Sequence, residues 1–317
     1  MKRADKIASS GATVVAPLGP SAAINGSLAP ARRHARRGIR RVLPGFGASL
    51  GYTLGYLSLL VIIPLGACFA KAMTLSPSEF WRVVSTPQAV AAYKLSVGAS
   101  LVAAALSVAL GLLVAWVLSR YEFPLKRLLD SLVDLPFALP TAVAGLVYSA
   151  LYVPKGWLGQ FLVPVKIPMI FPNGIRLAYS RAGIVLVLTF LGVPFVVRAL
   201  QPVLESLEAD VEEAAHLLGA TRWQTFWRVI LPVLRPALVT GFALSLARGL
   251  GEYGAVVFVS GNKPFQTEIA PVVIVASIES YHYAEAAAVA VVLLVLSFTL
   301  LVGINLLERW SKRFYAR

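Results

Sequence analysis

The 317-residue sequence predicts an all-α membrane protein with six transmembrane helices and both termini in the cytoplasm. Hydrophobic residues make up 58% of the chain and charged residues 14%, and the mean hydropathy is +0.75, values far from those of a soluble domain. Because about 20 helical residues cross a hydrocarbon core of roughly 30 Å, apolar runs near that length are candidate spans. Six such runs occur, at residues 49–70, 95–119, 132–153, 182–204, 236–260 and 286–307.

The six runs differ in the charges that they contain. The first, second and sixth contain none, which makes them the clearest spans. The third contains Asp134, the fourth Arg198, and the fifth both Arg248 and Glu252, so their limits are less well defined. The expected transmembrane domain covers residues 49–310, with a cytoplasmic loop at 205–235 inside it.

The distribution of Lys and Arg sets the orientation, since short basic loops stay in the cytoplasm. The face that carries both termini holds 19 of these residues and the other face holds 8. Residues 1–48 contain only one acidic residue, Asp5, and predict a disordered basic cytoplasmic tail, with an organellar transit peptide as the alternative. The net charge of +14 is concentrated in this tail and the inner loops, which favours membrane lipid over nucleic acid as a partner.

The cytoplasmic loop predicts two short helices joined at a glycine. The first is expected from residue 206 to 218, with Ser206 as its N-cap and Gly219 as its end. The second is expected to begin at Thr221 and to stop at Pro232 and Pro236 before the fifth span.

This helical hairpin predicts a docking surface for a soluble partner. Its apolar contact area would come from Leu217, Leu218, Trp223 and Phe226. The alternative is an amphipathic hairpin lying on lipid headgroups. Four acidic residues on the first helix oppose an anionic bilayer; they are Glu208, Asp210, Glu212 and Glu213.

Two other motifs are interpreted as chance matches. The segment Gly249–Gly254 fits a dinucleotide-binding fingerprint, but it is expected inside an apolar helix, where no helix N-terminus is free. The segment Gly47–Gly51 fits a nucleophile elbow but opens the first span. The chain contains no P-loop motif, so an ATPase would have to be another polypeptide.

The loop contains residues that resemble the signature of a known protein family. The residues Glu213-Ala214-Ala215, Gly219 and Val229-Ile230-Leu231-Pro232 resemble the Glu-Ala-Ala loop of ABC importer permeases, with Val229 in place of Ile as the one departure. The resemblance implies the type I importer (MetI-like) permease fold. It also implies that Glu213, Ala214, Ala215 and Gly219 couple the permease to a cytoplasmic ATPase.

Two further segments narrow the resemblance to the T-type (CysT) family of sulfate/thiosulfate permease subunits. Residues 134–146 resemble its third-span signature, and residues 247–262 with 267–269 resemble its fifth-span and outer-loop signature. Molybdate/tungstate permeases, or those for another oxyanion, are the nearest alternative. An ion-coupled secondary anion carrier is the alternative from a different class.

The resemblance also implies partners and a location. The expected assembly contains a W-type sister permease, two copies of an ABC ATPase and a periplasmic sulfate/thiosulfate-binding protein. The chain itself would be a transport subunit and not an enzyme, with no bound cofactor, while the partner ATPase uses ATP and Mg²⁺. The expected location is a bacterial inner membrane, with the chloroplast inner envelope as the alternative.

Three charged residues within the runs are candidates for the translocation pathway. Arg248 and Glu252 are one helical turn apart and opposite in sign, which favours a structural ion pair. The functional alternative is that Arg248 supplies positive potential for an anion while Glu252 limits it. Asp134, beside Pro136 and Pro140, is expected where a broken helix could turn backbone N–H groups toward the pathway.

Overall fold

The computed structural model describes residues 46–166, 174–207 and 209–315, and every regular element in these ranges is helical. The first elements are α1 (Phe46–Leu57), the π-turn η1 (Ser58–Ile62), α2 (Ile63–Ala72), α3 (Pro77–Val84), α4 (Pro87–Arg120), α5 (Lys126–Val133), α6 (Leu135–Ala138), α7 (Thr141–Tyr152) and α8 (Gly159–Leu162). They are followed by α9 (Arg181–Ser206), α10 (Ala209–Leu217), α11 (Arg222–Thr225), the π-turn η2 (Phe226–Ile230), α12 (Leu231–Leu250), α13 (Gly254–Ser260), α14 (Ala270–Glu279) and α15 (Tyr283–Tyr315).

The chain divides into two compact units, residues 1–55 and 56–317. Of the first unit the structure describes only the first ten residues of α1, so the basic tail expected at 1–48 lies almost entirely outside the described residues. The contacts described below belong to the second unit.

Five helical segments in the described chain are long and apolar enough to cross a membrane. They are Phe46–Ala72, Pro87–Arg120, Arg181–Ser206, Arg222–Leu250 and Tyr283–Leu306. The first, second, fourth and sixth predicted runs coincide with four of them, apart from small differences at the ends. The sixth spanning helix stays a prediction, because the helices of the third run are shorter.

The third predicted run, 132–153, is not one continuous helix. It is divided into the end of α5, the short α6 and the apolar α7. The break falls at Leu139, whose backbone is extended with φ −81° and ψ 132°, because the ring of Pro140 disfavours a helical conformation in the residue before it. The prediction of a broken helix beside Asp134 is confirmed, whereas its continuous length is wrong.

The fifth predicted run, 236–260, differs from the structure at both ends. The helix already runs from Arg222 through Pro232, because the π-turn η2 precedes the proline and the Leu231 N–H donates to the Phe226 carbonyl five residues back. At its other end α12 stops at Leu250, and α13 begins at Gly254 after a short break. Prolines 232 and 236 therefore do not separate the loop from the span.

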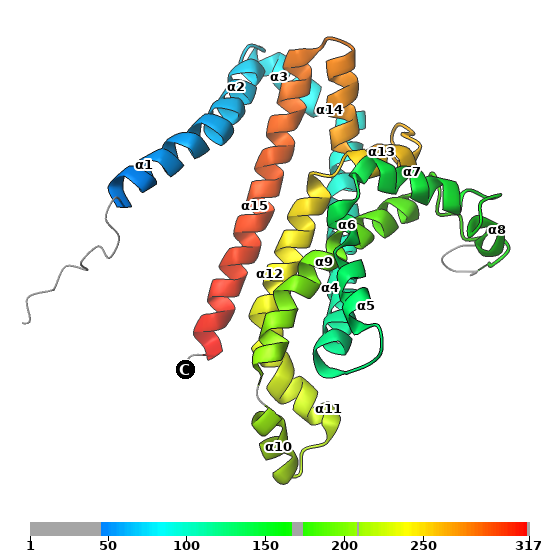
Figure 1. Cartoon of the computed structure of the whole chain (residues 1–317). Coiled ribbons are helices and arrows are strands. Elements are labelled where there is room, and N and C mark those ends of the chain that lie inside the picture. Colours follow the sequence, from blue (N-terminus) through cyan, green and yellow to red (C-terminus); the bar gives the residue numbers. More distant parts are fainter. Residues whose placement is uncertain (1–45, 167–173, 208, 316–317) are drawn as a thin grey trace, which may run out of the picture. The chain divides into compact units, whose positions relative to one another are not determined.

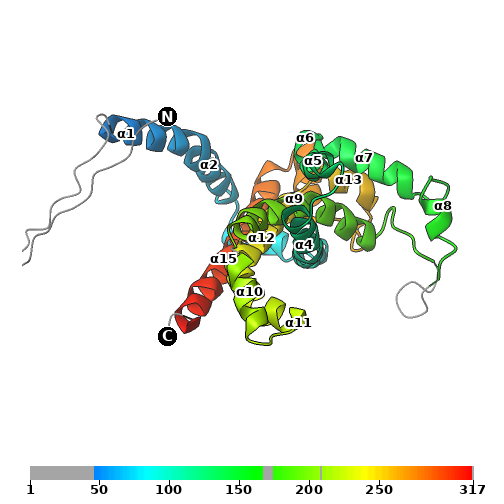
Figure 2. The same ribbon diagram turned by 60° about the horizontal axis from the view of Figure 1, so that its bottom comes forward.

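The centre of the second unit is a packed group of three helices, α4, α9 and α12, which lie side by side in Figures 1 and 2. Small residues permit their close approach. A Cβ at Gly192 of α9 would lie 2.1 Å from the Ser245 Oγ of α12 and 2.5 Å from the Ser107 Oγ of α4. The Ser107 hydroxyl donates to the Thr189 carbonyl at 3.2 Å, so this close contact also satisfies the buried Ser107 hydroxyl.

Two broken helices pack on each other beside this centre, since α13 contacts α7. The approach is close enough that a Cβ at Gly145 of α7 would lie 2.3 Å from the Ala255 carbonyl oxygen of α13. The helix break before α7 and the helix break before α13 therefore lie close together in the fold.

Candidate functional site

The first helix of the loop at 205–235, α10, ends at Leu217, and Gly219 terminates it as predicted. Gly219 has φ +80°, a left-handed conformation that glycine adopts without a Cβ clash. Its N–H donates to the His216 carbonyl at 2.9 Å, and the Ala220 N–H donates to the Ala215 carbonyl at 3.0 Å. This pair of bonds is a Schellman motif, which fixes the direction of the chain as it leaves the helix.

The start of this helix differs from the prediction. Ser206 is the last residue of α9, and its hydroxyl donates to the Val203 carbonyl at 3.0 Å, so it does not cap α10. Glu208, between the two helices, lies outside the described residues.

The second helix of the loop begins at Thr221, as predicted. The Gln224 N–H donates to the Thr221 hydroxyl at 3.3 Å, and the Thr221 N–H donates to the Gln224 side-chain oxygen at 2.9 Å. These reciprocal bonds form a capping box. The helix is continuous from Arg222 to Leu250, so the second helix of the loop runs directly into a candidate membrane span.

The turn of the hairpin exposes large apolar side chains. Leu217 is 90% exposed, Leu218 89% and Trp223 69%, and the neighbouring Glu213 and Ala214 are also exposed. A cluster of exposed apolar groups at the tip of a rigid hairpin is typical of a docking surface. Figure 1 shows α10 and α11 together, beyond the end of α9 and the start of α12.

Phe226 does not belong to this exposed surface, which corrects the prediction. It is partly buried and lies edge-on to Trp116 of α4, with ring centroids 5.8 Å apart. Phe226 therefore packs the second helix of the hairpin against α4.

Arg248 and Glu252 form the predicted ion pair, with 2.9 Å between Nη1 and Oε2. The Glu252 side chain is only 2% exposed, whereas that of Arg248 is 36% exposed. The second Glu252 oxygen accepts the Ala255 N–H at 2.9 Å, so one carboxylate both pairs with Arg248 and satisfies the first turn of α13.

This contact also corrects the interpretation of the segment Gly249–Gly254. The segment lies at a helix break, and not inside a continuous helix as predicted. The Ala255 N–H, in the first turn of the following helix, donates to the Glu252 carboxylate. A pyrophosphate at this helix start would need that N–H as a donor, so the carboxylate occupies its position.

Asp134 lies in a different network, centred on Arg198 of α9. Its two oxygens accept from Arg198 Nε at 2.8 Å and Nη2 at 2.6 Å. Arg198 Nη1 also donates to Asp130 Oδ1 at 2.8 Å and to Gln201 Oε1 at 2.7 Å. This bidentate pair ties α5 and α6 to α9.

The same network changes the acidity of Asp130. Burial raises the pKa of this carboxyl, but the hydrogen bonds from Arg198 and Gln201 outweigh burial and hold the pKa below its ordinary value. Asp130 therefore stays ionised and keeps the network charged.

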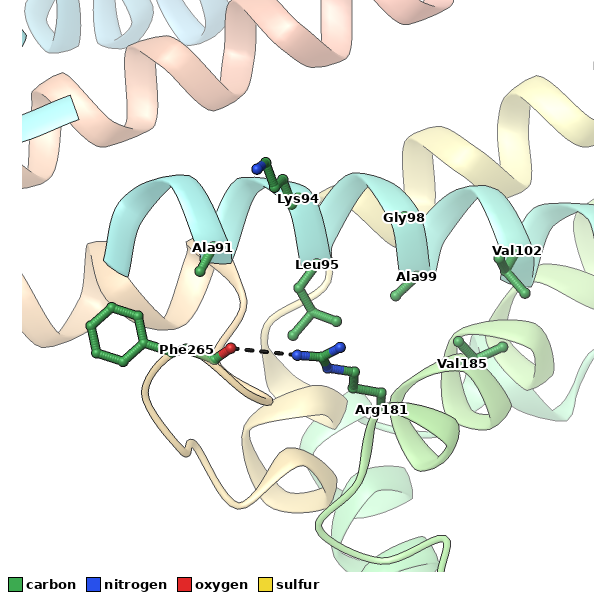
Figure 3. Close-up of a pocket in the computed structure, with 9 residues that line it drawn as sticks. All are labelled: Ala91, Lys94, Leu95, Gly98, Ala99, Val102, Arg181, Val185 and Phe265. Atoms are coloured by element: carbon green, nitrogen blue, oxygen red, sulfur yellow. Dashed lines mark hydrogen bonds between the residues drawn. The ribbon is translucent and has the colours of Figure 1, made fainter. Parts of the chain in front are cut away.

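A cavity of about 400 Å³ lies between α4, α9 and the loop before α14. Its charged residues do not converge, because Figure 3 shows Lys94 on the side of α4 away from Arg181. Arg181 instead donates to the carbonyls of Gln266 at 2.7 Å and Phe265 at 3.5 Å. The cavity walls are mostly apolar, so this arrangement holds the outer loop and does not form an anion site.

Comparison with known proteins identifies the family. Residues 107–314 match the family described as "Binding-protein-dependent transport system inner membrane component". The sulfate transport system permease protein CysT of Escherichia coli K12 is 46% identical over 275 residues, which cover 86% of this chain and 96% of that protein. The chain belongs to the CysT group of this permease family. The CysT protein of Synechococcus elongatus is similarly close, with 47% identity over 263 residues that cover 83% of this permease and 92% of the relative.

The fold of the permease also matches solved structures. A bacterial ABC transporter involved in the import of the acidic polysaccharide alginate superimposes with a TM-score of 0.66, covering 83% of this permease and 94% of that chain at 16% identity. The same transporter in complex with its alginate-bound periplasmic protein gives a TM-score of 0.63 at 17% identity. The expected importer-permease fold and inner-membrane location are confirmed.

Sequence reasoning missed two long-range contacts of this permease. Arg198 was recognised only as a charge within a span, and its partners lie 64 and 68 positions away. Arg120 pairs with Glu212 across 92 positions. The only local signal was an arginine inside an apolar run, for Arg198, or directly after one, for Arg120, where an unpaired charge is costly.

Proposed function

We propose that this permease forms half of the translocation pathway of an ATP-driven importer for sulfate and thiosulfate. The observation that carries the proposal is the similarity to CysT proteins along nearly their whole length, which includes the loop, the helix breaks and the outer segment. Two copies of an ABC ATPase, a W-type sister permease and a periplasmic binding protein complete the assembly. ATP and Mg²⁺ act on the ATPase.

The geometry of the loop supports a mechanical role in this importer. The Schellman turn at Gly219 and the capping box at Thr221 hold the hairpin in one shape, while the exposed Leu217 and Leu218 fit an apolar cleft of the ATPase. When ATP closes the ATPase dimer, the hairpin moves with it. The continuous helix Arg222–Leu250 then carries the displacement into the membrane and favours the outward-open state.

Arg248 is the best-placed cation for the anion pathway. Its side chain is partly exposed, while its partner Glu252 is buried and fixed by α13. Arg248 attracts a divalent anion, and Glu252 weakens that attraction enough for the anion to leave. Asp134, which accepts both of its bonds from Arg198, positions α6 beside α9 and is given no contact with the anion.

The substrate is tested by radiolabelled sulfate uptake in cells that lack this chain, with and without its restoration. We expect restored uptake that unlabelled thiosulfate blocks and unlabelled molybdate hardly affects. If restoration returns molybdate or tungstate uptake and no sulfate uptake, the permease architecture stands and the substrate proposal is wrong.

A further inference from the structure

Arg120, at the end of α4, contacts the cytoplasmic loop directly. Its Nη2 pairs with Glu212 Oε1 of α10, and the two side chains are only 22% and 31% exposed. Water and salt screen such a partly buried pair less than a fully exposed one. The Arg120 guanidinium also lies 5.7 Å from the ring centroid of Trp116, one turn earlier on α4, which fixes its position further.

The second arm of the hairpin, which consists of α11 and the π-turn η2, reaches the same end of α4. Phe226, on the π-turn η2, lies edge-on to Trp116. The last turn of α4 therefore touches α10 through an ion pair and the second arm through an aromatic pair. Without the ion pair, the described contacts give α10 no other side-chain hydrogen bond to a membrane helix.

We propose that Arg120 is a positioning residue that holds α10 against α4, so that a displacement of the loop reaches two spans together. The inference rests on the proposed function and adds a second route to it. The first route is the continuous helix into α12. The second is the Arg120–Glu212 pair into α4, which packs against both α9 and α12.

Binding of the ATPase and transmission of its movement then depend on different residues. The exposed surface around Glu213 and Leu217 does not include Arg120, so an ATPase binds that surface whether or not the ion pair forms. Loss of the pair leaves ATP hydrolysis in place but transmits its motion poorly. The expected consequence is fewer anions moved for each ATP hydrolysed.

The test uses the complete complex in proteoliposomes with its binding protein, and measures sulfate imported per ATP hydrolysed. We expect Arg120→Ala and Glu212→Ala each to lower this ratio about fivefold, while the ATPase co-purifies as with wild type. Because both changes remove the same interaction, the double variant should be no worse than either single variant. Lys126→Ala, which breaks the nearby Lys126–Glu122 pair, is the matched control and should keep the wild-type ratio.

Three outcomes would overturn the inference. They are single variants with the wild-type ratio, losses that multiply in the double variant, and loss of the ATPase from the purified complex. A cross-linking arm is independent of the substrate: R120C/E212C on a Cys68→Ala background should react with a short bifunctional thiol reagent, and no cross-link would show that the residues are not adjacent. A wild-type complex that imports no sulfate counts against the proposed function, whereas normal import by the single variants counts only against Arg120.

Discussion

Glu252 is a buried carboxylate with two polar partners. The residue is 1% exposed, and its two oxygens bind Arg248 and the Ala255 N–H. A buried carboxylate is stable only when it is paired in this way. The pair therefore fixes both the conformation of the Arg248 side chain and the strength of its positive potential.

Neutralising this carboxylate should strengthen anion binding. Glu252→Gln keeps an oxygen for the Ala255 N–H but leaves the Arg248 charge unbalanced, so we expect a lower KM for sulfate and a slower maximal uptake rate, each by about three- to tenfold. Uptake kinetics measure both values, and Glu279→Gln, an exposed carboxylate at the end of α14, is the control. An unchanged KM would remove Arg248 from the pathway.

The network around Arg198 predicts a pH dependence of stability. Since Asp130 has a lowered pKa in the folded state, it stabilises the fold at pH values above its unfolded pKa of about 3.9, and this contribution disappears as the pH falls through the lower folded value. Asp130→Asn should therefore melt at a lower temperature than wild type at pH 6, and the difference should shrink toward pH 3. Thermal unfolding of the purified complex tests this, and a pH-independent difference would contradict it.

At the scale of elements, the second helix of the hairpin and the span that follows it form one continuous helix. The sequence signals for the turn, Gly219 and Thr221, have purely local causes, and both are confirmed. The unbroken helix beyond them has a non-local consequence, because it joins the loop directly to α12. Under the proposed coupling role, movement of the tip moves α12.

Substitutions at Gly219 should reduce coupling in the order of their cost in the left-handed conformation. Asn adopts this conformation more easily than Ala, which costs about 1–2 kcal/mol there, while Val is worse and Pro excludes it. We expect ATPase co-purification and sulfate uptake to fall in the order Gly, Asn, Ala, Val, Pro. Gly303→Ala is the matched control because its new Cβ has no atom within 4 Å outside the adjoining residues and backbone of its own helix. Equal coupling across the series would mean that the turn does not set the docking geometry.

At the scale of the whole chain, the sequence predicts what depends on hydropathy and short motifs. Composition and run length predict the membrane class and four of the spans, because a span needs only length and apolarity. Proline gives the break at Leu139 for the same local reason. The break before α13 is less visible in the sequence: α12 ends at Leu250, and the buried Glu252 carboxylate accepts the Ala255 N–H in the first turn of α13.

Whether an ion pair of the site could be predicted also depends on how far apart its two residues lie in the sequence. The Arg248–Glu252 pair is four positions apart and could be predicted, whereas Arg198–Asp134 and Arg120–Glu212 depend on which helices become neighbours. Helix packing is set by small residues such as Gly192, whose contact residues Ser107 and Ser245 lie on other helices. Such pairings cannot be recognised from a single sequence, because they depend on which helices pack together.

In the proposed importer, ATP hydrolysis by a partner drives anion import through this chain. The most direct test is sulfate accumulation in proteoliposomes that contain the complete complex, compared with and without ATP and with and without the ATPase. We predict accumulation only when the ATPase, ATP and the binding protein are all present. Accumulation by the permeases alone, driven by an ion gradient, would contradict the claim and identify a secondary carrier.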